Sequence, residues 1–256
     1  MVSVQVNELL SELLEVLQLM LESGAEVYRV EESAQRICSA YGIGRTDVYA
    51  TTSNIIVTIE VRPGEIMTHT RRISRISTDI ERLDRLNALV RWVTETQPDI
   101  EVIRQRLRQI DNTPTYSTWV TLAFYGLIAG AFCFFFGSRS FSEFAVSTVI
   151  GIIVGCLTLL LGKASTNKLL DRFLCSLFAC CCAFACQHTG IISSVDYVII
   201  GNIMTLIPGI GLTNALRDLF TGDSISGILR MIEAVLLALA IACGYIVTTV
   251  LFGGAV

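Results

Sequence analysis

The residues best placed to do chemistry lie in a polar, charged segment between two apolar runs, at positions 207–230. The segment reads IPGIGLTNALRDLFTGDSISGILR, and its Pro208–Gly209 pair predicts a break in a helix. Thr213 is expected to cap a short helix that ends near Phe220. The free N–H groups and the positive dipole at the start of such a helix suit a carboxylate. These residue types predict a site for a small anion.

Charged side chains in and near this segment could complete the site. Arg217 would anchor the anion, and Asp218 or Asp196 could take up and release a proton during turnover. An alternative interpretation is an ordered cytoplasmic loop whose charges only satisfy one another. We expect Glu233, one turn beyond Arg230, to be the ion-pair partner of Arg230. The candidate substrate-binding residues are Asn202, Thr205, Pro208, Gly209, Thr213, Asn214 and Arg217.

The composition indicates an integral membrane protein. Of the 256 residues, 52% are hydrophobic and only 16% are charged, which is too apolar for an ordinary soluble chain of this length. All but six of the 19 Lys and Arg residues precede residue 114, so a charged region comes before an apolar one. The net charge of −4 gives no indication of nucleic-acid binding. Glu12 and Glu15 interrupt the leucine-rich start, so no signal peptide is expected.

The charged region, residues 1–113, predicts a small α+β cytoplasmic domain. Apolar residues at helical spacing predict four helices, the first of them amphipathic, and alternation predicts one hairpin with a turn at Arg62–Glu65. Thr78 followed by Glu81 forms a capping-box pattern at the start of the third helix, whose apolar stripe begins at Ile80. The predicted helices occupy about 9–22, 27–41, 79–93 and 98–110, and the predicted strands about 55–61 and 66–73.

The apolar region, residues 114–256, predicts a bundle of five transmembrane helices, so the fold class is a mainly α membrane protein. Five apolar runs are close to the roughly 20 residues needed to cross a bilayer. The loops after the second and fourth runs are rich in Lys and Arg, which places the N terminus in the cytoplasm and the C terminus outside. The runs are Ser117–Phe136, Phe144–Gly162, Phe173–Gly190, Val195–Leu212 and Ile228–Phe252.

Two pairs of glycines at i and i+4 are expected to let these helices pack closely within the chain. They are Gly126 with Gly130 and Gly151 with Gly155. Five helices make a thin wall for a transport path, and many transporters place two repeat units around a central site. We therefore expect a second membrane subunit or another copy of this chain, besides membrane lipids, as partners.

No catalytic arrangement, metal site or cofactor is predicted. The two histidines, His69 and His188, are expected in a strand and at a span end, and the nine cysteines are expected to be small packing residues. The phosphate-binding pattern GxxxxGK[ST] is absent, which favours transport driven by a gradient. In the charged domain, Glu26, Arg29, Glu31 and Ser53 are candidates for gating or interface contacts, although a solvated helix face would also explain the charges.

Three segments resemble the threonine/serine exporter family, in particular its half-length subunits. They are SGAEVYRVEESAQRICSAYGI at 23–43, TTSNIIVTI at 51–59 and the segment at 207–230. The resemblance implies a multi-pass protein of the bacterial inner membrane that exports threonine, serine or a short dicarboxylate such as succinate on the proton gradient. It also implies a second subunit that completes the exporter. A regulatory or scaffold subunit without transport activity is the alternative, and a membrane-bound hydrolase would need a nucleophile such as Ser53.

Overall fold

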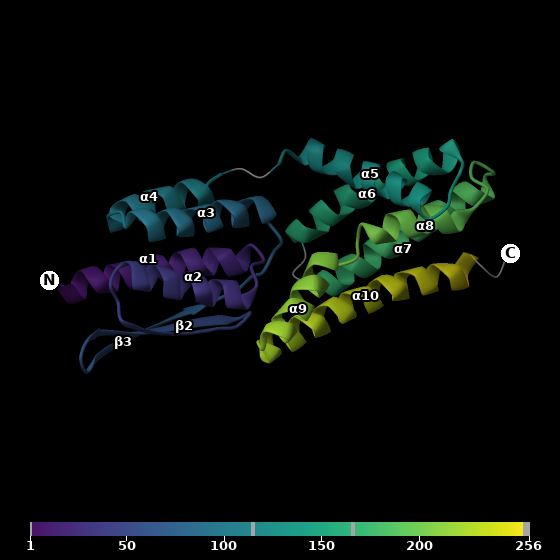
Figure 1. The fold of residues 1–256 in the computed structure, drawn as a ribbon. Helices are drawn as coiled ribbons and strands as arrows, with labels where there is room; N and C mark the ends of the chain where they lie inside the picture. Colours follow the sequence, from purple (N-terminus) through teal and green to yellow (C-terminus); the bar gives the residue numbers. More distant parts are fainter. Residues whose placement is uncertain (1, 114–115, 165–166, 253–256) are drawn as a thin grey trace. The chain divides into compact units, whose positions relative to one another are not determined.

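The computed structural model describes residues 2–113, 116–164 and 167–252, and it is mainly helical. Its internal contacts divide the chain into two compact units (Figure 1). Unit 1 comprises residues 1–114 and 210–232, and unit 2 comprises residues 115–209 and 233–256. The segment 210–230, which carries most of the predicted chemistry, therefore packs with the charged N-terminal region.

The N-terminal part of unit 1 has three layers (Figure 1): a sheet, the pair α1 and α2, and the pair α3 and α4. Helix α1 lies in the middle layer, so Leu10, Leu14 and Leu17 are buried, and Glu12 on another side of the helix is buried too. The prediction of an amphipathic first helix is confirmed, because Glu8, Ser11 and Glu15 form an exposed polar face, although the buried face is wide enough to include Glu12. The elements are α1 Val2–Glu22, α2 Val27–Ala40, β1 Arg45–Ala50, β2 Asn54–Arg62, β3 Glu65–Arg72, α3 Ile80–Thr96 and α4 Ile100–Asp111.

The sheet has three antiparallel strands in the order β1-β2-β3, one more than the predicted hairpin. The hairpin β2–β3 is confirmed, with Arg62 opposite Glu65 at its turn. Strand β1 was missed because its sequence RTDVYA offers little apolar alternation, and of its residues only Ala50 is buried. Its pairing with β2, for example Val48 opposite Val57, gives it a place in the sheet.

Helix α3 begins one residue later than the capping pattern predicted. Its N-cap is Asp79, whose side chain accepts a hydrogen bond from the backbone N–H of Arg82 at 2.9 Å. The predicted Thr78–Glu81 capping box was therefore wrong, because the residue three places after the true cap is Arg82. Ile80 is 54% exposed, so the buried stripe of this helix does not begin there. The stripe consists of Leu86, Leu89, Val90 and Val93.

Within the part of the chain that the structure describes, four helices are long and apolar enough to cross a membrane, and a fifth crossing results if α8 and α9 together count as one broken span. The count of five thus stays a prediction, while the mainly helical membrane fold is shown. The four helices are α5 Thr118–Phe135, α6 Phe141–Ala164, α7 Lys168–His188 and α10 Ser224–Phe252; the broken pair is α8 Val195–Met204 and α9 Gly209–Thr221.

Helices α5 and α6 pack closely in unit 2, and the predicted glycine pairs explain why. A methyl group added to Gly126 would lie 2.8 Å from the carbonyl oxygen of Thr148, and one added to Gly151 would lie 2.9 Å from that of Tyr125. Such distances exclude any side chain, so both glycines bring the two backbones together. The expectation that these glycines serve packing within the chain is confirmed. Several cysteines, among them Cys133 and Cys180, lie in the apolar core of unit 2, as expected.

Candidate functional site

The predicted helix break lies between α8, which ends at Met204, and α9, which begins at Gly209. The prediction of a break at this point is confirmed. The prediction that Thr213 caps the second helix was wrong, because α9 begins four residues earlier. Pro208 explains the early start, since proline has no N–H to lose and its fixed φ suits the entry to a helix.

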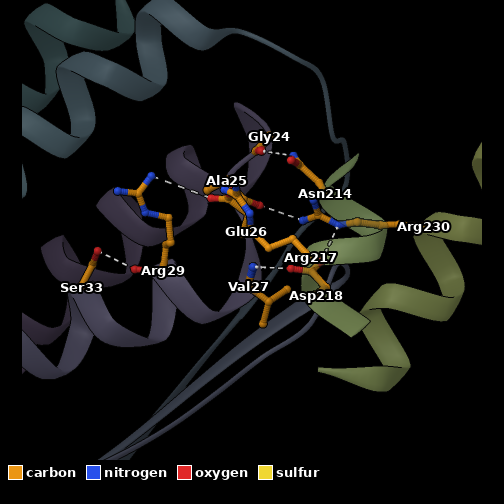
Figure 2. A network of polar contacts seen from close by, with 10 residues as sticks. All are labelled: Gly24, Ala25, Glu26, Val27, Arg29, Ser33, Asn214, Arg217, Asp218 and Arg230. Carbon is orange, nitrogen blue, oxygen red and sulfur yellow. Dashed lines mark hydrogen bonds and ion pairs between the residues drawn. The ribbon is translucent and has the colours of Figure 1, made fainter. Parts of the chain in front are cut away.

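One face of α9 carries three polar side chains toward the turn that joins α1 to α2 (Figure 2). Asn214, Arg217 and Asp218 share this face because they are spaced three and four residues apart. The side-chain Nδ2 of Asn214 donates to the carbonyl oxygen of Gly24 at 2.9 Å. Gly24 has φ of +96°, and a methyl group there would lie 3.0 Å from the carbonyl oxygen of Ser77. The tight turn that receives α9 thus requires glycine.

Asp218 acts at the start of α2, although it is 191 residues away in sequence. The backbone N–H of Val27, the first residue of α2, donates to Asp218 Oδ1 at 3.3 Å. The preceding residue, Glu26, occupies the N-cap position but makes no capping hydrogen bond with its side chain. A carboxylate at a helix N-terminus interacts favourably with the helix dipole. Asp218 thus supplies from α9 the acceptor that α2 lacks in its own sequence.

Arg230, in the first turns of α10, completes this arrangement (Figure 2). Its Nη2 donates to the carbonyl oxygen of Ala25 at 2.8 Å, and its Nε lies 3.3 Å from Asp218 Oδ2. The Arg230 side chain is 9% exposed and that of Asp218 is 0% exposed, so this ion pair is buried. The prediction that Glu233 pairs with Arg230 was wrong. Glu233 pairs instead with Lys168 Nζ at 2.9 Å, in unit 2.

Close contact between α9 and α10 directs Arg230 toward Asp218. A methyl group added to Gly227 would lie 2.9 Å from the backbone nitrogen of Leu219, so α10 can cross α9 here only with glycine. We call the resulting set of contacts the polar clasp, and it lies entirely within unit 1. The clasp consists of the turn residues Gly24, Ala25, Glu26 and Val27 together with Asn214, Arg217, Asp218 and Arg230.

Both carboxylate oxygens of Glu26 face arginine side chains. Arg217 Nη1 donates to Glu26 Oε1, and Arg29 Nη1 lies 4.0 Å from Glu26 Oε2. The side chain of Glu26 is 9% exposed, whereas those of Arg217 and Arg29 are 51% and 46% exposed. The carboxylate therefore lies inside, and both guanidinium groups keep an open side toward solvent.

The other two gating candidates hold local structure near the sheet. Glu31 Oε1 accepts a hydrogen bond from the backbone N–H of Ala50 at 2.8 Å. Burial raises the pKa of the Glu31 carboxyl and the negative charge of Asp223 adds to this rise, while the hydrogen bond from Ala50 opposes it. Ser53 is exposed, and its hydroxyl lies 3.4 Å from that of Thr51.

The remaining predicted site residues lie in unit 2 or at its boundary. Asn202 is fully buried, and its Nδ2 donates to Ser147 Oγ at 3.1 Å and to the carbonyl oxygen of Val198 at 2.9 Å. Thr205 Oγ1 donates to the carbonyl oxygen of Asn202 at 2.7 Å. Asp196 is exposed in the first turn of α8. Of the predicted substrate-binding residues, the clasp therefore brings together Asn214 and Arg217.

A further buried carboxylate, Glu143 at the start of α6, was not predicted from the sequence. It is 3% exposed and accepts hydrogen bonds from the Ser138 hydroxyl and from the backbone N–H of Ser194, the latter at 2.9 Å. Glu143 joins the loop after α5 to the start of α8. The sequence carried a signal for it, because Glu143 directly precedes the predicted apolar run Phe144–Gly162 and is the one acidic residue within 141–164.

Comparisons with known proteins match nearly the whole chain. The family model described as "Putative threonine/serine exporter" matches residues 13–252. A probable succinate transporter subunit of Klebsiella aerogenes is 25% identical over 237 residues, which cover 91% of this chain and 90% of that protein. The threonine/serine exporter of Corynebacterium glutamicum is 23% identical over 234 residues, which cover 88% of this chain but 47% of that protein. No solved structure matches the chain.

Proposed function

We propose a transport role from one premise: this chain belongs to the threonine/serine exporter family. It is a multi-pass protein of the bacterial inner membrane, and in our proposal it is one subunit of an exporter of small carboxylates. The cargo would be threonine and serine or a short dicarboxylate such as succinate, the substrates that the names of its relatives contain. The chain acts as a transporter subunit rather than as an enzyme.

The polar clasp is the observation that carries this proposal. It joins two segments that lie about 190 residues apart in the sequence, the α1–α2 turn and the α9–α10 hairpin, through three hydrogen bonds to backbone groups and the ion pair of Arg217 with Glu26. Within the hairpin, Asp218 and Arg230 form a buried ion pair. Burying charged side chains costs desolvation free energy, and buried ionisable groups are common at functional sites. The broken pair α8 and α9 leads directly into the clasp, and broken helices line the binding sites of many transporters.

In this proposal the cargo binds along the broken pair and the face of α9. Arg217 anchors its carboxylate, and the positive dipole end at the start of α9, near Pro208 and Gly209, favours an anion there. Asn202, Thr205, Thr213 and Asn214 provide the remaining polar contacts. Asp218 and Asp196 remain our candidates for proton coupling, with the buried Asp218 preferred because a change in its environment would alter its protonation. Glu26, Arg29, Glu31 and Ser53 serve gating on the cytoplasmic side.

A second subunit, or a second copy, completes the exporter in this proposal. The Corynebacterium relative is about twice as long as the matched region, so a further half accompanies the matched half in that protein. The absence of a GxxxxGK[ST] pattern from this chain supports a proton gradient as the driving force.

Transport in reconstituted vesicles tests this function. The full chain would be reconstituted alone and together with a candidate second membrane subunit, and the vesicles would be loaded with labelled threonine, serine or succinate. We expect efflux that requires an imposed proton gradient and stops when an uncoupler collapses it. Efflux that persists without the gradient would contradict proton coupling. No movement of any of the three compounds with the partner present would contradict the exporter assignment.

A further inference from the structure

We infer that Arg29 and Arg217 form a subsite for the carboxylate of the cargo, and that Glu26 occupies this subsite when cargo is absent. The inference rests on the proposed function and adds a competitor to its binding site. It starts from the arrangement of three charges, in which one carboxylate lies between two guanidinium groups. The Glu26 carboxylate stands where a ligand carboxylate would bind.

Glu26 is available for this role because α2 does not need it. A residue at the N-cap position ordinarily accepts a hydrogen bond from its own helix. Here Asp218 accepts the bond from Val27 instead, and the Glu26 side chain makes none to α2. Both carboxylate oxygens of Glu26 therefore face arginines, Oε1 toward Arg217 and Oε2 toward Arg29.

The two guanidinium groups have donors to spare. An arginine side chain carries five N–H donors in a fork that matches a carboxylate. Among the described residues, the guanidinium of Arg217 makes one hydrogen bond, to Glu26, and that of Arg29 makes only the 4.0 Å ion pair. Both side chains are about half exposed, so an anion from solvent can reach them. Two positive charges against one negative charge leave this position attractive to a second carboxylate.

Cargo binding would then release one contact of the clasp and leave the others in place. The hydrogen bonds from Asn214 to Gly24 and from Arg230 to Ala25 do not involve Glu26, and neither does the ion pair of Arg230 with Asp218. Displacement of Glu26 is therefore a local step that does not require unit 1 to open. An internal competitor lowers the apparent affinity by the fraction of time that it occupies the site.

Binding measurements on the full chain in lipid nanodiscs test the inference. Titration calorimetry would use three probes: succinate, L-threonine, and L-threonine amide, which keeps the ammonium group but lacks the carboxylate. Glu26→Gln should bind succinate and threonine about tenfold more tightly than the natural chain, if Glu26 holds the subsite about nine-tenths of the time. Arg217→Gln should reduce binding of both compounds at least tenfold. Threonine amide should bind to neither the natural chain nor the Glu26→Gln variant.

The control variant is Glu32→Gln. Glu32 lies on α2 and pairs with Arg36 at 3.7 Å on an exposed surface, so this change removes the same charge without affecting Arg29 or Arg217. It should leave all affinities unchanged. Thermal unfolding of each variant identifies any that fails to fold, and Glu26→Asp, which keeps the charge on a shorter side chain, then replaces Glu26→Gln and should show a smaller gain in affinity.

The outcomes separate this inference from the proposed function. Unchanged or weaker binding by a folded Glu26→Gln variant overturns the competition by Glu26. Unchanged binding by Arg217→Gln overturns the subsite, even if the natural chain with its partner still exports cargo and the proposed function stands. Equal binding of threonine and threonine amide also overturns it, because the carboxylate would then make no contact. Loss of the proposed function itself would show only as absent transport by the natural chain with its partner.

Discussion

A buried carboxylate facing a buried guanidinium is costly to separate, and Asp218 with Arg230 is such a pair. Each also bonds a backbone group of the α1–α2 turn, Asp218 the N–H of Val27 and Arg230 the carbonyl of Ala25. The pair therefore links three elements through two side chains. Its contribution to folding and its proposed part in proton coupling can be tested separately.

Asp218→Asn should destabilise the chain because Arg230 would keep a buried charge without its counter-ion. The expected loss is about 3 kcal/mol of unfolding free energy, or a melting temperature roughly 6–12 °C lower in detergent. The double variant Asp218→Asn with Arg230→Met should recover most of this loss. If Asp218 carries the coupling proton, the recovered double variant should still lack gradient-driven efflux.

Glu233→Gln is the matched control for this prediction. It breaks the pair with Lys168, in which both side chains are half exposed, so it should change the unfolding free energy by no more than about 0.5 kcal/mol. Efflux by the double variant at the natural rate would remove Asp218 from the coupling mechanism. An equal loss of stability in Glu233→Gln and Asp218→Asn would contradict the assignment of the buried pair.

Glu31 makes a pH-dependent contribution with a definite sign. Burial raises the pKa of its carboxyl in the folded chain above the usual value of 4.5. Between these two pKa values the folded chain keeps a proton that the unfolded chain has lost, so stability falls as pH rises through this interval. Glu31→Gln cannot lose a proton and can still accept the hydrogen bond from Ala50. Its melting temperature should exceed that of the natural chain at pH 7 and match it more closely near pH 4.5. A lower melting temperature at pH 7 would contradict this sign.

Among the elements, the α9–α10 hairpin depends on one close approach. A methyl group on Gly227 would meet the backbone nitrogen of Leu219 at 2.9 Å and the carbonyl oxygen of Ala215 at 3.0 Å. Gly227→Ala should therefore push α10 away from α9 and destabilise the chain by about 1–3 kcal/mol. Because Arg230 follows one turn later, the variant should also weaken the clasp. Protease digestion of the purified chain should then cut sooner within residues 210–232.

Gly162→Ala is the control for this change. A methyl group on Gly162, in α6, would meet no atom within 4 Å. Alanine is favoured over glycine inside a helix, so this variant should be as stable as the natural chain or slightly more stable. If both glycine variants behaved alike, the close crossing of α9 and α10 would be contradicted.

For the helices and strands, the sequence predicted features that depend on neighbouring residues. It did not predict contacts between residues that are far apart in the chain. Helical spacing located the helices, and the Pro208–Gly209 pair located the break, because both signals depend on neighbouring residues. Strand β1 was not predicted because what identifies it as a strand is its pairing with β2, which its own sequence pattern does not show. The site shows the same limit: Glu233 was expected to pair with Arg230 because it is one turn away. The actual partner, Asp218, faces Arg230 only after α10 has folded back on α9.

For the whole molecule, the clasp constrains how often the chain crosses the membrane. The α9–α10 hairpin contacts the α1–α2 turn, so both must lie on the same side of the bilayer. The number of crossings between α4 and α9 must therefore be even. If helices α5, α6 and α7 each cross the membrane, we predict that a fourth crossing comes from α8 and the break after it. Ten residues of α8 extend only about 15 Å, half of a hydrocarbon core of about 30 Å, so the predicted crossing would also need the residues of the break.

Five crossings would place the C terminus on the side opposite to the N-terminal domain, and reporter fusions can test this prediction. With the N-terminal domain in the cytoplasm, alkaline phosphatase fused after residue 256 should be active and green fluorescent protein at the same position should be dark. Fusions to a chain truncated after residue 223, at the α9–α10 turn, should give the reverse result, because this turn must share the side of the α1–α2 turn. A fluorescent fusion after residue 256 together with an active phosphatase after residue 190 would mean four crossings in all. In that case α10 would begin outside the cell, and the hydrogen bonds of Asn214, Asp218 and Arg230 to residues 24–27 could not form in the membrane-inserted protein.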